Sequence, residues 1–262
     1  MGSAQTQGEL WGARAREWAD LQEVSFGPLY DAALKAAKAA TGSAVLDVGC
    51  GAGLALKMAQ ARGAKVSGLD AAAGLVEIAR SRCPGGDIRL GECEELPFAD
   101  NSFDVTTGFN SFQYATDPVH ALSEAKRVTK PNGYVVVAVW GAADQCELAP
   151  YLAAVGKLLP PPPPPPGAPG PFALSAPGAL EALVGKAGLT PGDIASVITT
   201  MRFPDEATTV RGLLASGVAE RAIRNSGEDA VRKGVSDAVR PSRKGDGSYE
   251  FKNEWRFLLS RA

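Results

Sequence analysis

The residues best suited to chemistry lie in one short stretch, Val45-Leu46-Asp47-Val48-Gly49-Cys50-Gly51-Ala52-Gly53. An apolar strand leads into a turn with glycine at every second position. Glycine accepts positive φ and lets a ligand approach the backbone closely. A strand followed by such a turn and a helix forms the nucleotide pocket of open α/β sheets. The dinucleotide spacing G-x-G-x-x-G would need a glycine at position 54, where the chain has Leu54. The stretch therefore predicts a nucleotide pocket, but not a typical dinucleotide one.

A second acidic residue follows where such a pocket needs one. Asp70 directly follows the predicted strand Lys65–Leu69. In nucleotide-binding α/β folds, an acid at the tip of the second strand accepts hydrogen bonds from both ribose hydroxyls. A dehydrogenase would also carry an acid there, and a loop cap for the next helix is a further interpretation. Asp70 alone therefore predicts a nucleoside but does not identify which one.

These residues are positioned by strands and helices that alternate along the chain, which predicts a parallel sheet with right-handed crossovers. The predicted strands are 44–48, 65–69, 88–90, 103–108 and 134–140, and the predicted helices are 54–62, 74–82 and 118–128. The segments before residue 44 and after residue 140 are less regular. The first forty residues are predicted to be helical: Trp11, Ala15 and Trp18 share one helix face, and a second helix is predicted from Pro28 to Gly42.

The chain after Trp140 departs from this alternation. The run Pro160–Pro166 predicts polyproline II, either as a stiff connector or as a ligand for an aromatic groove. The later segments predict a helix at 177–187, a strand at 194–202, a helical stretch at 206–239 and a final strand at 249–259.

Five motifs between Ser43 and Trp140 together resemble one family. Asp47–Gly53 is similar to D-x-G-x-G-x-G, motif I of the class I S-adenosylmethionine-dependent methyltransferases. Asp70 occupies the expected place after it. The segment Gly91-Glu92-Cys93-Glu94-Glu95-Leu96-Pro97-Phe98 resembles G-D-A-E-x-L-P-F of the type 11, ubiquinone/menaquinone-like subgroup, with Glu92 and Cys93 in place of aspartate and alanine. Phe109–Gln113 follows the fourth strand, and Arg127–Tyr134 resembles the R-V-L-K-P-G-G turn, with Asn132 replacing a glycine.

The resemblance implies a Rossmann-like α/β fold with a seven-stranded sheet whose last strand is antiparallel, and with helical lid elements. We expect a single domain over 1–262, with a core at 43–140, an N-terminal helical cap at 1–42 and substrate-side segments at 141–192 and 204–246. The implied cofactor is S-adenosylmethionine, with S-adenosylhomocysteine as product. The implied cofactor-binding residues are Asp47, Gly49, Cys50, Gly51, Gly53, Asp70, Ala71, Glu92, Cys93, Phe109 and Asn110.

For the acceptor the sequence offers an aromatic set and no base. Candidate substrate residues are Trp11, Trp18, Tyr30, Phe112, Gln113 and Trp140, although core packing explains the tryptophans equally well. The single histidine, His120, is predicted to point outward from its helix. Methyl transfer from a sulfonium is an in-line displacement that depends chiefly on alignment, and we therefore name no catalytic residue.

The net charge and the cysteine spacing limit the kinds of partner and cofactor that we expect. The formal net charge is −2, which predicts neither nucleic acid nor an anionic membrane as partner. The four cysteines lack metal or redox spacing, and no apolar run or secretory signal is evident, so we expect a cytoplasmic protein without a metal. The favoured function is methylation of a small, fairly apolar molecule. A non-catalytic protein that binds S-adenosylmethionine or its product and, remotely, an NAD(P)-dependent oxidoreductase stay open.

Overall fold

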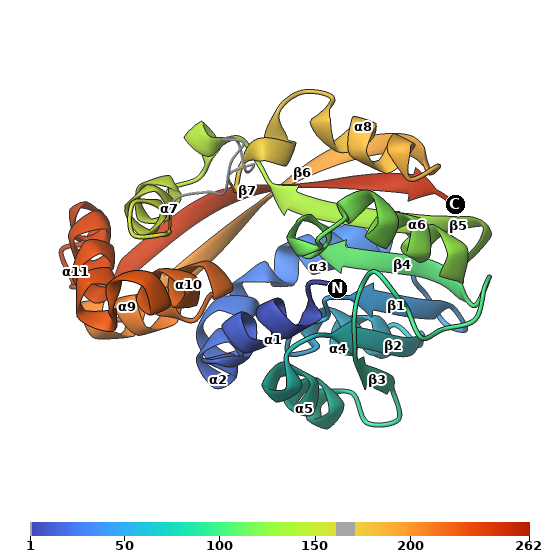
Figure 1. The fold of residues 1–262 in the computed structure, drawn as a ribbon, viewed down its shortest axis with the longest axis horizontal. Helices are drawn as coiled ribbons and strands as arrows, with labels where there is room; N and C mark the ends of the chain where they lie inside the picture. The colour runs from blue at the N-terminus through green and yellow to red at the C-terminus, as the bar shows by residue number, and fades with distance from the viewer. Residues whose placement is uncertain (1, 161–170) are drawn as a thin grey trace.

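The strands predicted between residues 44 and 140 form the larger part of one mixed sheet. In the computed structural model, which describes residues 2–160 and 171–262, the sheet has seven strands in the order β3-β2-β1-β4-β5-β7-β6 (Figure 1). Strand β7 pairs antiparallel with both β5 and β6, and the other pairs are parallel. The predicted fold class is thus confirmed. The strands are β1 (Ala44–Val48), β2 (Lys65–Asp70), β3 (Asp87–Leu90), β4 (Phe103–Phe109), β5 (Thr129–Trp140), β6 (Thr190–Phe203) and β7 (Tyr249–Arg261).

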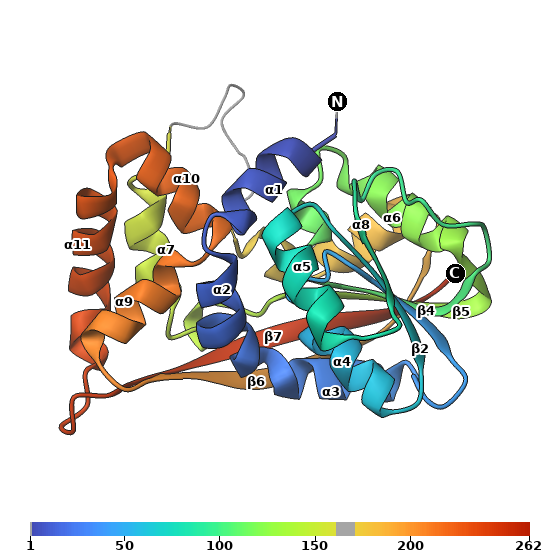
Figure 2. The ribbon, with the colours of Figure 1, turned by 90° about the horizontal axis from the view of Figure 1, so that it is seen from below.

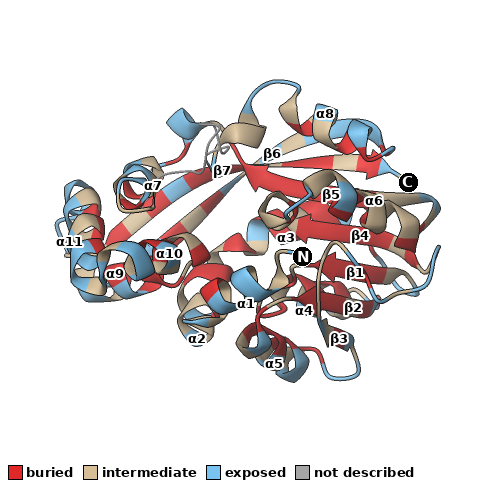
Figure 3. Cartoon of the chain, viewed as in Figure 1, coloured by how far each residue is buried: buried red, intermediate tan, exposed pale blue. Residues whose placement is uncertain are grey.

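The sheet has an apolar core on each face, because side chains alternate along a strand. In β5, Val136, Ala138 and Trp140 enter one core, and the intervening valines enter the other. Figure 3 shows the central strands as the most continuously buried part of the chain. One face is covered by α3 (Gly27–Ala36), α4 (Leu54–Ala61) and α5 (Ala73–Arg82), and the other by α6 (Pro118–Val128) and α8 (Ala179–Lys186).

The N-terminal cap is more broken than predicted. It consists of α1 (Ala4–Gly12), the short α2 (Ala15–Glu17), a π-helical turn η1 (Trp18–Gln22) and a 3-10 turn η2 (Glu23–Phe26). The helix predicted to reach Gly42 ends at Ala36. Lys38 takes a φ of 56°, and the N–H groups of Lys38 and Ala39 bond back to the carbonyls of Lys35 and Leu34. This Schellman ending stops the helix without a glycine.

The C-terminal helices form a layer beside the end of β6 and the beginning of β7 (Figure 2). The layer comprises α7 (Ala149–Gly156), α9 (Glu206–Leu214), α10 (Gly217–Ser226) and α11 (Glu228–Val239). The helical stretch predicted over 206–239 is confirmed as helical, and it is divided into three helices. It divides where the Ser216 side chain caps α10 and again at Gly227. Single 3-10 turns lie at Phe112–Tyr114, Ala143–Gln145, Ala173–Ser175 and Arg240–Ser242.

Two local predictions are confirmed. Asp117 caps α6 by accepting the N–H groups of Val119 and His120. Asn132 takes the expected positive φ, 63°, in the irregular first part of β5, where the register with β4 shifts. The prediction for Pro160–Pro166 falls, apart from Pro160, outside the described residues. Within the described ranges, no helix combines the length and apolar character needed to cross a membrane.

Candidate functional site

A cavity opens at the carboxyl ends of β1, β2, β3 and β4, beneath the N-terminal cap. The empty space in it, counted out to the open mouth, is about 870 Å³. The sheet order reverses between β1 and β4, and ligands of open α/β sheets bind at this kind of switch point. The topology therefore brings together segments far apart in the sequence.

Most of the predicted cofactor residues line this cavity: Gly49, Gly51, Asp70, Ala71, Glu92, Cys93, Phe109 and Asn110. The other three lie behind its wall. Asp47 is buried and accepts a hydrogen bond from Thr107 Oγ1 at 2.7 Å. Burial raises the pKa of Asp47 well above its ordinary value, although the Thr107 bond works against this. Cys50 is buried against Gly68, and Gly53 begins α4. These three residues shape the loop from behind.

Asp70 ties the glycine-rich loop to the tip of β2. Its Oδ2 accepts the Gly51 N–H at 2.9 Å and its Oδ1 accepts the Ala72 N–H at 2.8 Å. Burial raises the pKa of Asp70, while these backbone donors lower it. Since a carboxylate has about four acceptor positions, both oxygens can still accept hydrogen bonds from a ligand. The capping interpretation and the ligand interpretation of Asp70 are thus compatible.

Gly49 is required by two separate constraints. Its φ is 73°, and a Cβ at this position would stand 2.4 Å from Ser111 Cβ. We expect Gly49→Ala to lower the free energy of unfolding by about 3 kcal/mol, from backbone strain plus overpacking. Gly42→Ala is the matched control, because Gly42 has a φ of 86° and open space around it. Urea denaturation should give a loss of only about 1 kcal/mol there. Equal losses would contradict the role of Ser111.

Glu92 holds the N-terminal cap over the cavity. Its Oε2 accepts the Ala4 N–H at 2.7 Å, and its Oε1 lies 3.3 Å from Ser3 Oγ. Burial alone would raise the pKa of Glu92, but these and neighbouring donors lower it below its ordinary value. Gly8 of α1 packs against the Ala71 carbonyl. The start of α1 therefore depends on a carboxylate in the wall of the cavity.

The other side of α1 is joined to the C-terminal helices. Arg224 of α10 pairs with Glu9 at 3.0 Å, and Glu228 of α11 pairs with Arg14 at 3.0 Å. Trp11 packs on Gly217 at the start of α10. The cap thus connects the sheet to the C-terminal layer across the mouth of the cavity.

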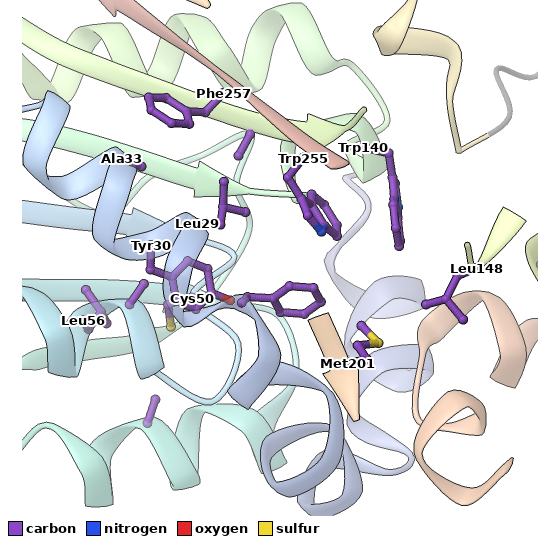
Figure 4. Close-up of a cluster of buried hydrophobic side chains, with 14 of the residues drawn as sticks. Leu29, Tyr30, Ala33, Cys50, Leu56, Trp140, Leu148, Met201, Trp255 and Phe257 are labelled. Atoms are coloured by element: carbon purple, nitrogen blue, oxygen red, sulfur yellow. The ribbon is translucent and has the colours of Figure 1, made fainter. Parts of the chain in front are cut away.

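One part of the cavity is aromatic. Tyr30 and Phe109 meet with ring centroids 4.6 Å apart, Phe26 and Trp255 at 5.1 Å, and Trp11 and Tyr114 at 5.6 Å. Figure 4 shows Leu29, Tyr30 and Trp255 converging from α3 and β7. Of the candidate substrate residues, Trp11, Trp18 and Tyr30 line the cavity.

The other candidate substrate residues lie elsewhere. Phe112 is buried in the core on the α6 side of the sheet, and Trp140 stacks on Trp255 at 4.2 Å. Gln113 donates its amide N–H to Asn110 Oδ1. Lining residues that the sequence motifs do not predict include Ser3, Gln7, Phe26, Leu29, Tyr114 and Trp255. Tyr114 follows the fourth-strand motif closely and could have been found, whereas nothing local in the sequence connects Trp255 to this site.

The cavity is acidic and offers no ordinary base. Among the described residues that line it, the charged side chains are Asp70 and Glu92, with no Lys, Arg or His. Burial raises the pKa of Tyr114 and of Cys93 to about 12 each, so both keep their protons at neutral pH. His120 is exposed on α6, opposite the buried Leu122 face, as predicted. Within residues 2–160 and 171–262, no group of His, Cys, Asp and Glu is arranged to hold a metal ion.

Comparison with known proteins extends these observations. Residues 46–137 match the family model described as "Methyltransferase domain". The chain is 40% identical over 100 residues to demethylmenaquinone methyltransferase of Renibacterium salmoninarum, covering 38% of this chain and 42% of that protein. It is 35% identical over 107 residues to malonyl-[acyl-carrier protein] O-methyltransferase of Serratia marcescens, covering 41% and 42%. The similarity thus spans about two fifths of these relatives.

Solved structures share the fold over a larger part of the chain. The YcgJ protein of Bacillus subtilis superposes with a TM-score of 0.59 at 19% identity, covering 92% of this chain and 98% of that one. A SAM-dependent methyltransferase from Aquifex aeolicus gives a TM-score of 0.54 at 21% identity, covering 71% and 92%. These similarities concern the fold, including the C-terminal part that the family model does not reach.

Proposed function

We propose that this chain, whose residues 46–137 match the family model of a methyltransferase domain, transfers a methyl group from S-adenosylmethionine to a small, fairly apolar acceptor. One observation carries the proposal. The two carboxylates of the cavity, Asp70 and Glu92, lie at successive strand ends beside the glycine-rich loop, and an aromatic compartment adjoins them. A nucleoside with a positively charged sulfonium fits such a wall, because acids and aromatic faces both attract a cation.

The residue assignments follow from this placement. Asp70 accepts the ribose hydroxyls and Glu92 accepts the adenine amino group, while the Cys93 N–H meets the adenine ring. Glu92 can do this while still capping α1, because a carboxylate has several acceptor positions. Gly49 and Gly51 admit the cofactor close to the backbone. The remaining cofactor residues, Asp47, Cys50, Gly53, Ala71, Phe109 and Asn110, complete or support this wall.

The mechanism relies on position more than on acid–base chemistry. When bound, the cofactor supplies a methyl group on a positively charged sulfur. The cap and the aromatic side chains hold the acceptor in line with that methyl and keep water out, and such alignment is worth roughly 7–11 kcal/mol of the barrier. Burial raises the pKa of Tyr30 well above its ordinary value, so this hydroxyl donates hydrogen bonds and does not remove a proton. The nucleophilic atom of the acceptor must therefore react without deprotonation by a base of the cavity.

The wall of the cavity also favours one kind of acceptor. The names of the two relatives refer to a malonyl group, which is an anion, and to demethylmenaquinone, a neutral molecule. With no cation among the described lining residues, an acceptor carboxylate would enter without a positive partner, whereas the carboxylate of the cofactor is accompanied by the cofactor's own ammonium. We infer an acceptor without a carboxylate. In this proposal residues 1–42 form a cap over the acceptor, and the described parts of 141–192 together with 204–246 form the substrate-side lid. The proposed location of the protein is the cytoplasm.

Calorimetry on the purified chain tests the proposal directly. We expect S-adenosylmethionine and S-adenosylhomocysteine to bind with micromolar affinity and NAD to show no binding. Radiolabelled S-adenosylmethionine with a panel of neutral aromatic and carboxylate acceptors should label the neutral ones. Binding of NAD in place of the adenosyl compounds would overturn the proposal. Binding without transfer to any acceptor would favour a regulatory protein of the same fold.

A further inference from the structure

The indole N–H of Trp18 lacks a hydrogen-bond partner. Within the described part of the chain, Trp18 Nε1 is buried and unpaired, although the ring lines the cavity. A buried donor without a partner costs free energy, so a native structure that keeps one requires an explanation. Trp18 also begins the π-helical turn η1, a rare conformation that is frequent at functional sites. Both observations indicate that a ligand bound in the cavity accepts a hydrogen bond from this N–H.

The nitrogen lies directly over the glycine-rich loop. Trp18 Nε1 and Glu23 Oε1 are each 3.3 Å from the point where a Cβ on Gly51 would stand. Because Gly51 has no side chain, the space between this N–H and the loop backbone stays open. A larger residue at position 51 would fill it.

The loop has already used its own donors. The N–H groups of Gly49 and Cys50 both bond to the Leu69 carbonyl, and that of Gly51 bonds to Asp70. Further along the loop, the N–H groups of Gly53 and Leu54 bond to the Cys50 carbonyl and to Glu23, while the intervening Ala52 is buried and does not line the cavity. An anionic group that reaches this loop from the cavity therefore finds these N–H groups bonded, and Trp18 Nε1 offers an unused donor beside them.

The proposed function determines which group lies there. With the adenosine at Glu92 and Asp70, the amino-acid end of the cofactor extends along the loop toward Phe109. That end carries an ammonium and a carboxylate, and only the carboxylate can accept a hydrogen bond. We propose that Trp18 Nε1–H binds the carboxylate of the amino-acid end of S-adenosylmethionine. This inference rests on the proposed function and makes Trp18 a cofactor-binding residue rather than part of the acceptor site.

Trp18→Phe tests the inference, because it keeps an aromatic ring and removes the N–H. Two ligands separate the effects: S-adenosylhomocysteine carries the carboxylate, and 5′-methylthioadenosine lacks the whole amino-acid end. In calorimetry we expect the variant to bind S-adenosylhomocysteine about tenfold more weakly, the size typical of one hydrogen bond to a charged group. The Kd for 5′-methylthioadenosine should stay unchanged. Trp140→Phe, which removes an indole N–H outside the cavity, should alter neither value.

Changing the ligand tests the same contact in the wild-type chain, so this result does not depend on whether a variant folds. Decarboxylated S-adenosylhomocysteine should bind the wild type about tenfold more weakly than the intact compound and bind Trp18→Phe equally weakly. Equal weakening of all three ligands in the variant would mean that the ring only shapes the site, which overturns the inference. Unchanged binding of S-adenosylhomocysteine would overturn it too. If the wild type bound none of these adenosyl compounds, the proposed function itself would fail, which is a distinguishable result.

Discussion

Asp70→Ala is expected to weaken the binding of S-adenosylhomocysteine at least about a hundredfold. The variant loses the acceptor proposed for two ribose hydroxyls, and each hydrogen bond to a charged group contributes roughly 1.5–3 kcal/mol. It also releases the Gly51 and Ala72 N–H groups, which leaves the glycine-rich loop free to move. Titration calorimetry should therefore show almost no heat at ligand concentrations that saturate the wild-type chain.

Asp87→Ala is the matched control for this loss. Asp87 begins β3 and is exposed at the amino end of that strand, away from the carboxyl ends where the cavity opens, and it pairs there with Arg89. Its replacement should leave the affinity unchanged, since exposed ion pairs contribute little and the cavity is distant along the strand. A tenfold or smaller loss in Asp70→Ala would mean that the ribose hydroxyls have another partner. The assignment of Asp70 would then have to be abandoned, even if the cofactor still binds.

The part of the site that the sequence predicts is the part built from short local segments. The glycine spacing, Asp70 and Glu92 each follow directly from a strand, so their position at the sheet edge follows from the strand order. The regular α/β alternation makes that order predictable. The termination of α3 at Lys38 was not predictable in this way, because a non-glycine residue takes the left-handed conformation there.

The contacts that close the site join residues far apart in the chain. Trp255 reaches the cavity from the last strand, and Glu23 meets Arg82 across the cap. No periodicity or spacing in the sequence reports such pairs, since they arise only when the cap packs on the assembled sheet. The division of the helical stretch 206–239 into three helices has a local origin instead, because caps at Ser216 and Gly227 outweigh its helix-forming composition.

The pair formed by Glu23 and Arg82 fastens the cap to the glycine-rich loop. Glu23 is 1% exposed, and its Oε1 also accepts the Leu54 N–H at 3.3 Å. Arg82 further donates to the carbonyls of Ala52 and Ala19 at 3.1 Å each. Burial raises the pKa of Glu23 from 4.5 to about 7, although Arg82 and the backbone donors counteract this. The N-terminal cap and the cofactor loop are thus held by one partly charged contact.

The sign of the resulting pH dependence follows from proton binding. Between pH 4.5 and about 7 the folded chain holds a proton on Glu23 that the unfolded chain has lost. The contribution of Glu23 to stability is therefore greatest below pH 4.5 and falls as the pH rises through 7, by roughly 3 kcal/mol in total. Glu23→Gln should remove this fall, which urea denaturation at pH 5 and pH 8 can measure.

Arg82→Met should destabilise the chain far more at pH 8 than at pH 5. At pH 8 it leaves a buried carboxylate without its cation, which costs about 3–5 kcal/mol. At pH 5 Glu23 is protonated, and the loss reduces to the unpaired Ala19 and Ala52 carbonyls, about 1–2 kcal/mol. The double variant Glu23→Gln/Arg82→Met has no buried carboxylate that could be left without a cation. Its loss of unfolding free energy should therefore be the same at both pH values. An equal loss in Arg82→Met at pH 5 and pH 8 would show that Arg82 acts through packing alone and that the cap is not held by charge.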